Sequence, residues 1–294
     1  MHQKKSLPAR LAASDEIASQ ALDALAGANL IDRVMKGLKA DEFHVAFQPI
    51  VHAQTGTLSG VECLLRWWHP DYGVLLPGSF RHAFDNVDVA RETSYFVLES
   101  VCQQLANLRK SGIDAPAHVA INIQPSQLVD DALSEKIKAI TDKHAVDPCL
   151  LELELIETED VAKILAVHEF TRSLRRLGVR LAIDDFGTGY SSLTTLDRMH
   201  IDTVKLTREF LLGIPASPLA CTVVSTILDL FARLGIAAVA EGVETGEQLR
   251  WLAQRPEILV QGYYIAPPRP TLPEALQGQR SFTGRPSVGP RGKR

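Results

Sequence analysis

Polar residues recur at the ends of short apolar segments along this chain, and this repetition constrains the fold more than any other feature. Eight such segments occur, and six of them end in a carboxylate, an amide or an amine. Single acids at strand ends are common on surfaces, whereas oxygen-bearing side chains at one end of successive strands are typical of a barrel rim. The residues are Glu62, Asn122, Glu154, Asp184, Asp185, Lys205 and Glu241, with Gln261 inside the last segment.

The order of the segments predicts an α/β fold. The first two strands are joined by a short turn at 53–56, which favours an antiparallel pair, and strands then alternate with helices. Polar groups at almost every strand end favour a (β/α)8 TIM-like barrel with an antiparallel first strand; a doubly wound open sheet is the alternative. The predicted strands are Phe43–Phe47, Leu58–Leu65, His118–Ile123, Leu150–Ile156, Val179–Ile183, Thr203–Leu206, Ile236–Ala240 and Ile258–Ile265. The predicted helices are Arg91–Lys110, Gln127–Lys143, Asp160–Leu177, Pro218–Leu234 and Thr245–Ala253.

Three regions are expected along the chain. Residues 1–39 read as a helical lead-in, either a coupling or dimer helix or a cover for the open bottom of the barrel. The barrel domain spans 40–272. Residues 273–294 are rich in Arg, Gly, Pro and Ser without periodicity, which predicts a disordered basic tail.

Composition excludes several classes of protein. The net charge of −4 provides no basic field for binding duplex nucleic acid. No apolar segment approaches the roughly 18–20 residues of a membrane span. The four cysteines, Cys63, Cys102, Cys149 and Cys221, form no CxxC pair, which favours apolar packing over zinc or disulfides. A cytoplasmic location is the resulting expectation.

The acids themselves point to metal. Two adjacent carboxylates such as Asp184 and Asp185 diverge after a strand, so one can bridge two cations while the other binds one. Period-two geometry places Glu152 and Glu154 on the same side of their strand, where they point into a barrel or toward solvent. Like charges buried together are unfavourable unless cations neutralise them. An Asp-rich turn and a solvated acidic face remain the alternatives for each motif taken alone.

The motifs together resemble the EAL domain family of bacterial cyclic di-GMP phosphodiesterases. The resemblance covers Phe43 to about Pro270, and its motifs fall in family order. They are Gln48-Pro49-Ile50, Glu62-Cys63-Leu64-Leu65-Arg66-Trp67, Asn122, Glu154-Leu155-Ile156-Glu157, Asp184-Asp185-Phe186-Gly187-Thr188-Gly189-Tyr190-Ser191-Ser192, Lys205, Glu241-Gly242-Val243-Glu244 and Gln261-Gly262-Tyr263.

The resemblance implies a role for each matched residue. The first Mg²⁺ or Mn²⁺ would be held by Glu62, Asn122, Glu154 and Asp184. Asp184 would bridge to a second ion, shared with Asp185 and Glu241. Lys205 would contact the attacking water or a phosphate oxygen, and with Asp185 and Glu241 it forms the implied catalytic set. The implied substrate contacts are Gln48, Arg66, Gln261, Tyr263 and Glu244, and Glu157 would anchor the loop that follows Asp184. The family also implies a homodimer.

Three positions depart from the family pattern: Thr207, Cys63 and Gln124, which stands where the family often has a serine after Asn122. Thr207 stands where the family has an aspartate after the lysine, which removes a carboxylate beside the centre. Losses of this kind typically cost about 10–100-fold in affinity or activity. Cys63 replaces the alanine of the signature tripeptide, one small apolar residue for another.

Three functions therefore remain open. The first is hydrolysis of cyclic di-GMP to linear pGpG with two Mg²⁺ or Mn²⁺ ions, and the full set of implied metal ligands favours it. The second is a weak or inactive domain that acts as a cyclic di-GMP receptor, which Thr207 leaves possible. The third is a regulator that works through a protein partner.

Overall fold

A computed structural model describes residues 29–128, 132–156, 168–187 and 200–277. The predicted helical region before residue 29 and the loop residue Glu157 lie outside these ranges. Of the tail 273–294 predicted to be disordered, residues 273–277 belong to helix α10 (Leu272–Gln277), and the rest lies outside these ranges. In the part of the chain that the structure describes, no helix combines the length and apolar character that crossing a bilayer requires.

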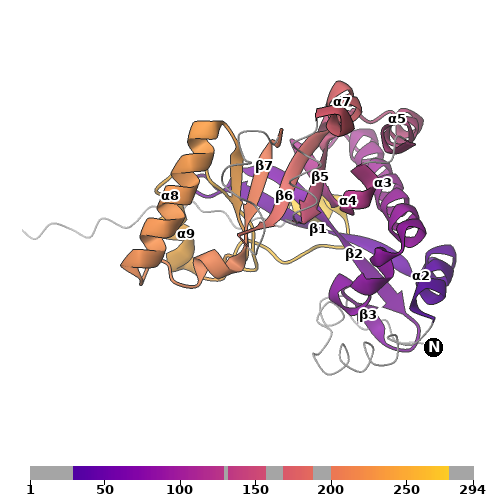
Figure 1. The fold of residues 1–294 in the computed structure, drawn as a ribbon, viewed down its shortest axis with the longest axis horizontal. Coiled ribbons are helices and arrows are strands. Elements are labelled where there is room, and N and C mark those ends of the chain that lie inside the picture. The colour runs from indigo at the N-terminus through magenta and orange to yellow at the C-terminus, as the bar shows by residue number, and fades with distance from the viewer. Residues whose placement is uncertain (1–28, 129–131, 157–167, 188–199, 278–294) are drawn as a thin grey trace, which may run out of the picture.

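The strands form a closed barrel, so the predicted fold is confirmed (Figure 1). β1 is antiparallel to β2 on one side and to β9 on the other, and this double pairing closes the sheet. The remaining barrel neighbours are parallel. β3 extends β2 as a hairpin outside the barrel. The strands are β1 (Phe43–His52), β2 (Leu58–His69), β3 (Gly73–Leu75), β4 (His118–Asn122), β5 (Leu151–Ile156), β6 (Arg180–Phe186), β7 (Thr203–Leu206), β8 (Ala237–Ala240) and β9 (Leu259–Val260).

Helices connect the parallel strands around the outside of the barrel (Figure 1). The predicted helix 218–234 is confirmed, with Ser217 accepting a bond from the Ala220 backbone at one end and Gly235 in the left-handed conformation at the other. The predicted helix 127–143 overlaps the described helices α4 and α5, and residues 129–131 lie outside the described part. The α-helices are α2 (Leu30–Lys39), α3 (Val87–Lys110), α4 (Pro125–Leu128), α5 (Ala132–His144), α7 (His168–Leu177), α8 (Pro218–Leu234), α9 (Gly246–Leu252) and α10 (Leu272–Gln277). The 3-10 turns are η2 (Pro77–Ser79), η3 (Arg81–Asp85), η4 (Pro148–Leu150) and η5 (Arg208–Leu211).

Alternate residues of each strand face the outer helices and the barrel interior. Those facing the helices are apolar and buried, as Ile121, Leu153 and Val204 illustrate. The inward positions of the same strands instead carry Asn122, Glu154 and Lys205. Polar groups in the centre of a barrel need partners, because burial removes their hydration. The barrel interior therefore contains the candidate site.

Helix α2 does not cover the bottom of the barrel. It precedes β1, whose first residue Phe43 pairs with Trp67 of β2. Trp67 follows Cys63, the last residue of β2 that pairs with β4. Because β1 runs antiparallel, its start lies at the end of the barrel where the parallel strands finish. There Arg33 of α2 stacks over the Trp67 ring at 5.1 Å and pairs with Glu42 at 2.7 Å. Of the two expectations for the lead-in, the bottom cover is thus wrong for this helix.

Several strand ends differ from the sequence prediction, and two of them carry or precede residues of the site. β6 continues through Asp184 and Asp185, with a register shift against β7 between Ile183 and Phe186. β9 ends at Val260, so Gln261 follows the strand instead of lying within it. The strand stops because Gly262 has φ +156° and passes so close to Val243 that a Cβ would lie 2.3 Å from its backbone nitrogen and oxygen.

The cysteine prediction is correct for two residues and wrong for a third. Cys63 and Cys102 are buried, and all four cysteines are free thiols. Burial raises the pKa of the Cys102 thiol to about 12, so this group is an inert packing residue. Cys149 is exposed, because it lies in the η4 turn that Asp147 caps before β5 begins.

Candidate metal centre

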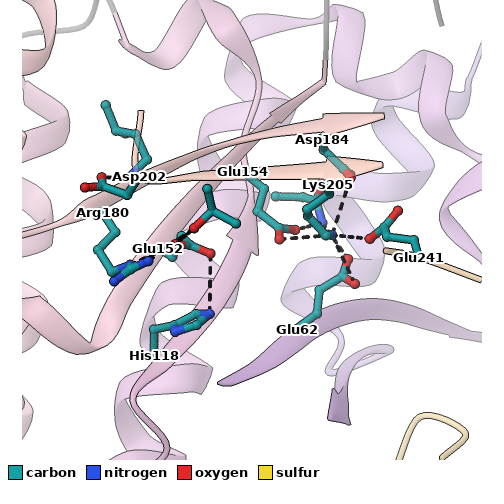
Figure 2. Close-up of polar contacts among 12 residues, drawn as sticks. Glu62, His118, Glu152, Glu154, Arg180, Asp184, Asp202, Lys205 and Glu241 are labelled. Atoms are coloured by element: carbon teal, nitrogen blue, oxygen red, sulfur yellow. Dashed lines mark hydrogen bonds and ion pairs between the residues drawn. The ribbon is translucent and has the colours of Figure 1, made fainter. Parts of the chain in front are cut away.

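Lys205 of β7 lies at the centre of the carboxylate group. Its side chain is 1% exposed, and its Nζ contacts carboxylate oxygens from four other elements (Figure 2). These oxygens are Glu154 Oε1 at 2.9 Å, Glu241 Oε1 at 2.7 Å, Glu62 Oε2 at 3.3 Å and Asp184 Oδ1 at 3.4 Å. The structure thus brings together side chains that are far apart in the sequence, such as Glu62 and Glu241.

Two amide side chains join the carboxylates to one another. Asn122 Nδ2 donates to Glu62 Oε1 at 3.1 Å and to Glu154 Oε2 at 3.3 Å. Gln261 Nε2 donates to the second Glu62 oxygen at 2.7 Å and to Gln48 Oε1 at 3.1 Å. Gln48 in turn donates to the Ala266 carbonyl. Glu62 is therefore held on both oxygens, and Gln261 belongs to the centre itself.

A local change in β6 brings both aspartates to the same rim. In a regular strand, adjacent side chains point to opposite faces. Asp185 adopts φ +56°, in the left-handed region, at the point where the register with β7 shifts. As a result Asp184, Asp185 and Glu241 offer oxygen atoms that all lie within 4.8 Å of one another. This grouping is the arrangement that a shared cation requires.

The centre carries more negative charge than Lys205 neutralises. Burial, reinforced by the neighbouring carboxylates, raises the pKa of Glu154 well above its ordinary value, although Lys205 opposes the shift. The same causes raise the pKa of Glu241 to about 8. Burial opposes the charge on Lys205, but the four carboxylates outweigh burial and raise its pKa. Burial followed by the charge of Asp184 raises the pKa of Asp185.

The residues present fit a hard divalent cation. The available donors are carboxylate and amide oxygens, which suit Mg²⁺ or Mn²⁺ and not zinc in a thiolate site. Additional positive charge would relieve the repulsion that raises the pKa of Glu154 and Glu241. The described groups that converge on this point are Glu62, Asn122, Glu154, Asp184, Asp185 and Glu241.

The expected substrate-binding residues differ in burial and in their hydrogen-bond and ion-pair partners. Arg66 is buried, and Nη1 donates to the Leu65 carbonyl at 2.7 Å while Nε has no hydrogen-bond partner among the described residues. Tyr263 is 71% exposed. Glu244 pairs with Arg208 at 2.9 Å, and no described contact joins it to the carboxylates. Thr207 is buried directly before η5.

A cavity of about 290 Å³ beside Asn122 was not predicted from the sequence. It lies between β2, the η2–η3 segment and α3, and its lining includes Leu64, Pro77, Thr93 and Ser94. These residue types also occur in ordinary cores, so no sequence motif identifies the cavity. Its position next to an expected metal ligand makes it part of the same region.

Fold and site together define the class of protein: a closed mixed barrel whose carboxyl-end rim carries an acidic centre, where barrel enzymes hold their active sites. The EAL domain family model matches residues 31–268. This chain belongs to the EAL domain family, as the motifs predicted.

Named relatives support this membership. RocR, a cyclic di-GMP phosphodiesterase of Pseudomonas aeruginosa, is 36% identical over 238 residues, which are 81% of this chain and 60% of RocR. NbdA, another cyclic di-GMP phosphodiesterase of that organism, is 34% identical over 251 residues, covering 85% of this chain and 32% of NbdA. The chain thus spans between a third and three fifths of the length of these relatives.

Solved structures share the fold. The structure of PaMucR phosphodiesterase in complex with c-di-GMP superposes with a TM-score of 0.74 at 30% identity, covering 82% of this chain and 98% of that one. The FimX EAL domain of Pseudomonas aeruginosa bound to c-di-GMP superposes with a TM-score of 0.73 at 19% identity, a likeness of fold alone.

Proposed function

We propose that this chain hydrolyses cyclic di-GMP to linear pGpG with two Mg²⁺ or Mn²⁺ ions. The observation that carries the proposal is the convergence of Glu62, Glu154, Asp184 and Glu241 on Lys205. Membership of the EAL domain family supports the substrate, since relatives with this domain are named cyclic di-GMP phosphodiesterases.

Different residues of this chain have different roles in the proposed reaction. Water adds to one phosphorus and the bond to a ribose 3′ oxygen breaks, which leaves a 5′ phosphate on the linear product. The bound cations would supply Lewis-acid polarisation of the phosphate and of the water. Lys205 places its ammonium beside the attacking water or a phosphate oxygen, and Arg66 offers a planar donor group to the second phosphate. Gln261 holds Glu62 in place for its ligand role, and Gln48 in turn accepts a hydrogen bond from Gln261.

A receptor without turnover is the second candidate, because Thr207 removes the family carboxylate beside the centre. A receptor would bind cyclic di-GMP through the same contacts but would not hydrolyse it. A regulator acting through a protein partner is the third possibility, and a homodimer in the cytoplasm is the expected setting for any of these functions.

The test uses purified protein with Mn²⁺ or Mg²⁺ and cyclic di-GMP, with pGpG measured by chromatography and nucleotide binding by calorimetry. We expect pGpG from the wild-type chain and none from Glu62→Ala. Glu135→Ala, which removes an exposed acid in the first turn of α5, is the matched control and should retain the wild-type rate. Binding without product would favour the receptor, and neither binding nor product would favour the protein regulator.

A further inference from the structure

The barrel interior contains a second polar cluster, which we call the lower cluster. It consists of His118, Glu152 and Arg180, which Figure 2 shows, together with Thr203. Glu152 is its hub and is 1% exposed. Glu152 Oε2 accepts hydrogen bonds from Thr203 Oγ1 at 2.7 Å and Arg180 Nε at 2.9 Å. Arg180 Nη2 also donates to Thr203 Oγ1 at 3.2 Å, and His118 Nε2 lies 3.5 Å from Glu152 Oε1.

Each member of the lower cluster shares a strand and a face with a member of the metal centre. Glu152 lies two residues before Glu154 on β5, and Thr203 lies two residues before Lys205 on β7. Arg180 precedes Asp184 by four residues on β6, and His118 precedes Asn122 by four on β4. Even spacing keeps side chains on one face of a strand. The two clusters are therefore successive layers of the same barrel interior.

The strand β2, which carries Glu62, packs closely against His118 of the lower cluster. Gly60 lies two residues before Glu62 and pairs with His118. A Cβ at Gly60 would lie 2.5 Å from His118 Nε2, so the His118 ring fills the space in which a side chain would stand. Only glycine allows β2 to approach β4 at this level without displacing that ring.

The lower cluster has no direct part in the expected chemistry. Arg180 already supplies the positive charge that Glu152 needs, so the cluster lacks the excess of acids that favours a cation. Its contacts instead cross between strands, and a slip of one residue in any strand would turn its inward side chains outward. A buried carboxylate with fixed partners penalises such slips, because a misplaced strand would leave its charge unpaired.

We propose that the lower cluster fixes the register and spacing of strands β4 to β7, so that Glu152, Arg180 and Thr203 are positioning residues for the metal centre above them. The inference rests on the proposed function, because that function requires the centre to bind metal. It adds residues that neither touch the metal ligands nor belong to the family motifs recognised in the sequence.

The test replaces Thr203 with valine, which has the same shape but neither donates to Glu152 nor accepts from Arg180. We expect Thr203→Val to raise the Mn²⁺ dissociation constant, measured by calorimetry, about 10-fold, and to lower kcat for cyclic di-GMP by a similar factor. KM should change less than about twofold, since the substrate contacts remain. Thr203→Ser keeps the hydroxyl and should restore both values. Thr222→Val, which removes an exposed hydroxyl on α8, is the matched control and should bind Mn²⁺ as the wild type does.

A second variant tests whether the cluster acts as a unit. Thr203 and Glu152 share one bond, so Glu152→Gln combined with Thr203→Val should weaken Mn²⁺ binding by less than the product of the single effects. A Thr203→Val protein with wild-type Mn²⁺ affinity and kcat but a lower Tm would overturn the proposal, because the cluster would then be merely structural.

The same measurements distinguish this inference from the proposed function. A wild-type protein that binds Mn²⁺ without forming pGpG would contradict the proposed function, and the comparison of Mn²⁺ affinities would still decide the role of the lower cluster. A wild-type protein that binds neither Mn²⁺ nor Mg²⁺ would overturn both.

Discussion

Single residues set the charge balance of the centre. One ammonium, that of Lys205, faces four carboxylates. Burial, reinforced by the neighbouring carboxylates, raises the pKa of Glu154 and of Glu241. Thr207 is the residue that departs most from the family at this point. Its side chain is buried. A backbone hydrogen bond, followed by a hydrogen bond from the Thr207 side chain, lowers the pKa of the exposed Glu209 carboxyl.

Restoring the family carboxylate should raise activity. We expect Thr207→Asp to increase kcat about 10-fold, because outer groups around metals typically change activity by about 10–100-fold. The measurement is initial pGpG formation with saturating Mn²⁺. Thr207→Asn, which matches the aspartate in shape without its charge, is the control and should leave the rate near that of the wild type. Equal rates for Thr207→Asp and the wild type would show that the missing carboxylate has no effect.

His118 should make stability fall in mild acid. Burial lowers the pKa of His118, Arg180 lowers it further, and Glu152 opposes both. In the unfolded chain a histidine titrates near about 6.5, so below that pH the unfolded state binds a proton that the folded state does not. Stability is therefore present above pH about 6.5 and is lost as the pH falls through that value toward the lowered folded pKa.

The measurement is the free energy of unfolding in urea at several pH values. His118→Gln should give a shallower loss of stability between about pH 7 and pH 5 than the wild type. His82→Gln replaces an exposed histidine and should leave the slope unchanged. A slope that is the same in His118→Gln and the wild type would contradict the assignment.

At the scale of elements, the irregular ends of two strands, β6 and β9, determine where the side chains of the metal centre lie. β6 keeps two aspartates at one rim through the left-handed Asp185 and the register shift beside it. β9 ends early, and the chain then turns through Gly262 against Val243. This turn places the Gln261 amide on Glu62. The irregular backbone at these two strand ends therefore directs the side chains of Asp184, Asp185 and Gln261 toward the centre.

Gly262→Ala should therefore be costly. The added Cβ would meet Val243 backbone atoms at 2.3 Å, and φ +156° belongs to a region essentially restricted to glycine. We expect a loss of about 2 kcal/mol or more in the free energy of unfolding, together with weaker Mn²⁺ binding as Gln261 shifts. Gly112→Ala is the matched control, because Gly112 also has positive φ but no atom lies within 4 Å of its added Cβ. Equal losses in the two variants would show that contact with Val243 is unimportant.

At the scale of the whole molecule, closure of the barrel is what assembles the centre. β1 bridges β2 and β9, so Glu62 from the start of the domain meets Gln261 from its end. The centre holds several acids around one lysine, and folding must bring them together against their repulsion. Cations that bind only the folded state should therefore stabilise the entire domain.

Metal should raise the thermal stability of the protein. At a free Mn²⁺ concentration 100 times its dissociation constant, linkage adds about 2.7 kcal/mol, which corresponds to a rise in Tm of roughly 5–10 °C for a domain of this size. Chelation should reverse the rise. Glu154→Gln should reduce it, whereas Glu99→Gln, at a partly exposed acid paired with Lys143, should not. A Tm that is insensitive to Mn²⁺ would contradict the metal centre.

Much of this fold could be predicted from the sequence. Alternating strands and helices, with a short first connection, were enough for the barrel and its antiparallel strand, because side-chain periodicity and connection length are local properties. The polar strand ends identified Glu62, Glu154 and Asp184 for the same reason. The early end of β9 could not be predicted, since it depends on the contact of Gly262 with the distant Val243.

The sequence by itself determined which residue types stand at the strand ends and in what order. Only the tertiary structure decided how they meet: Lys205 among four carboxylates, Gln261 on Glu62, and the layer of Glu152, Arg180 and Thr203 beneath them. The physical reason is that inward positions along a strand follow from its period of two, whereas the distance between side chains on different strands follows from register, shear and barrel closure.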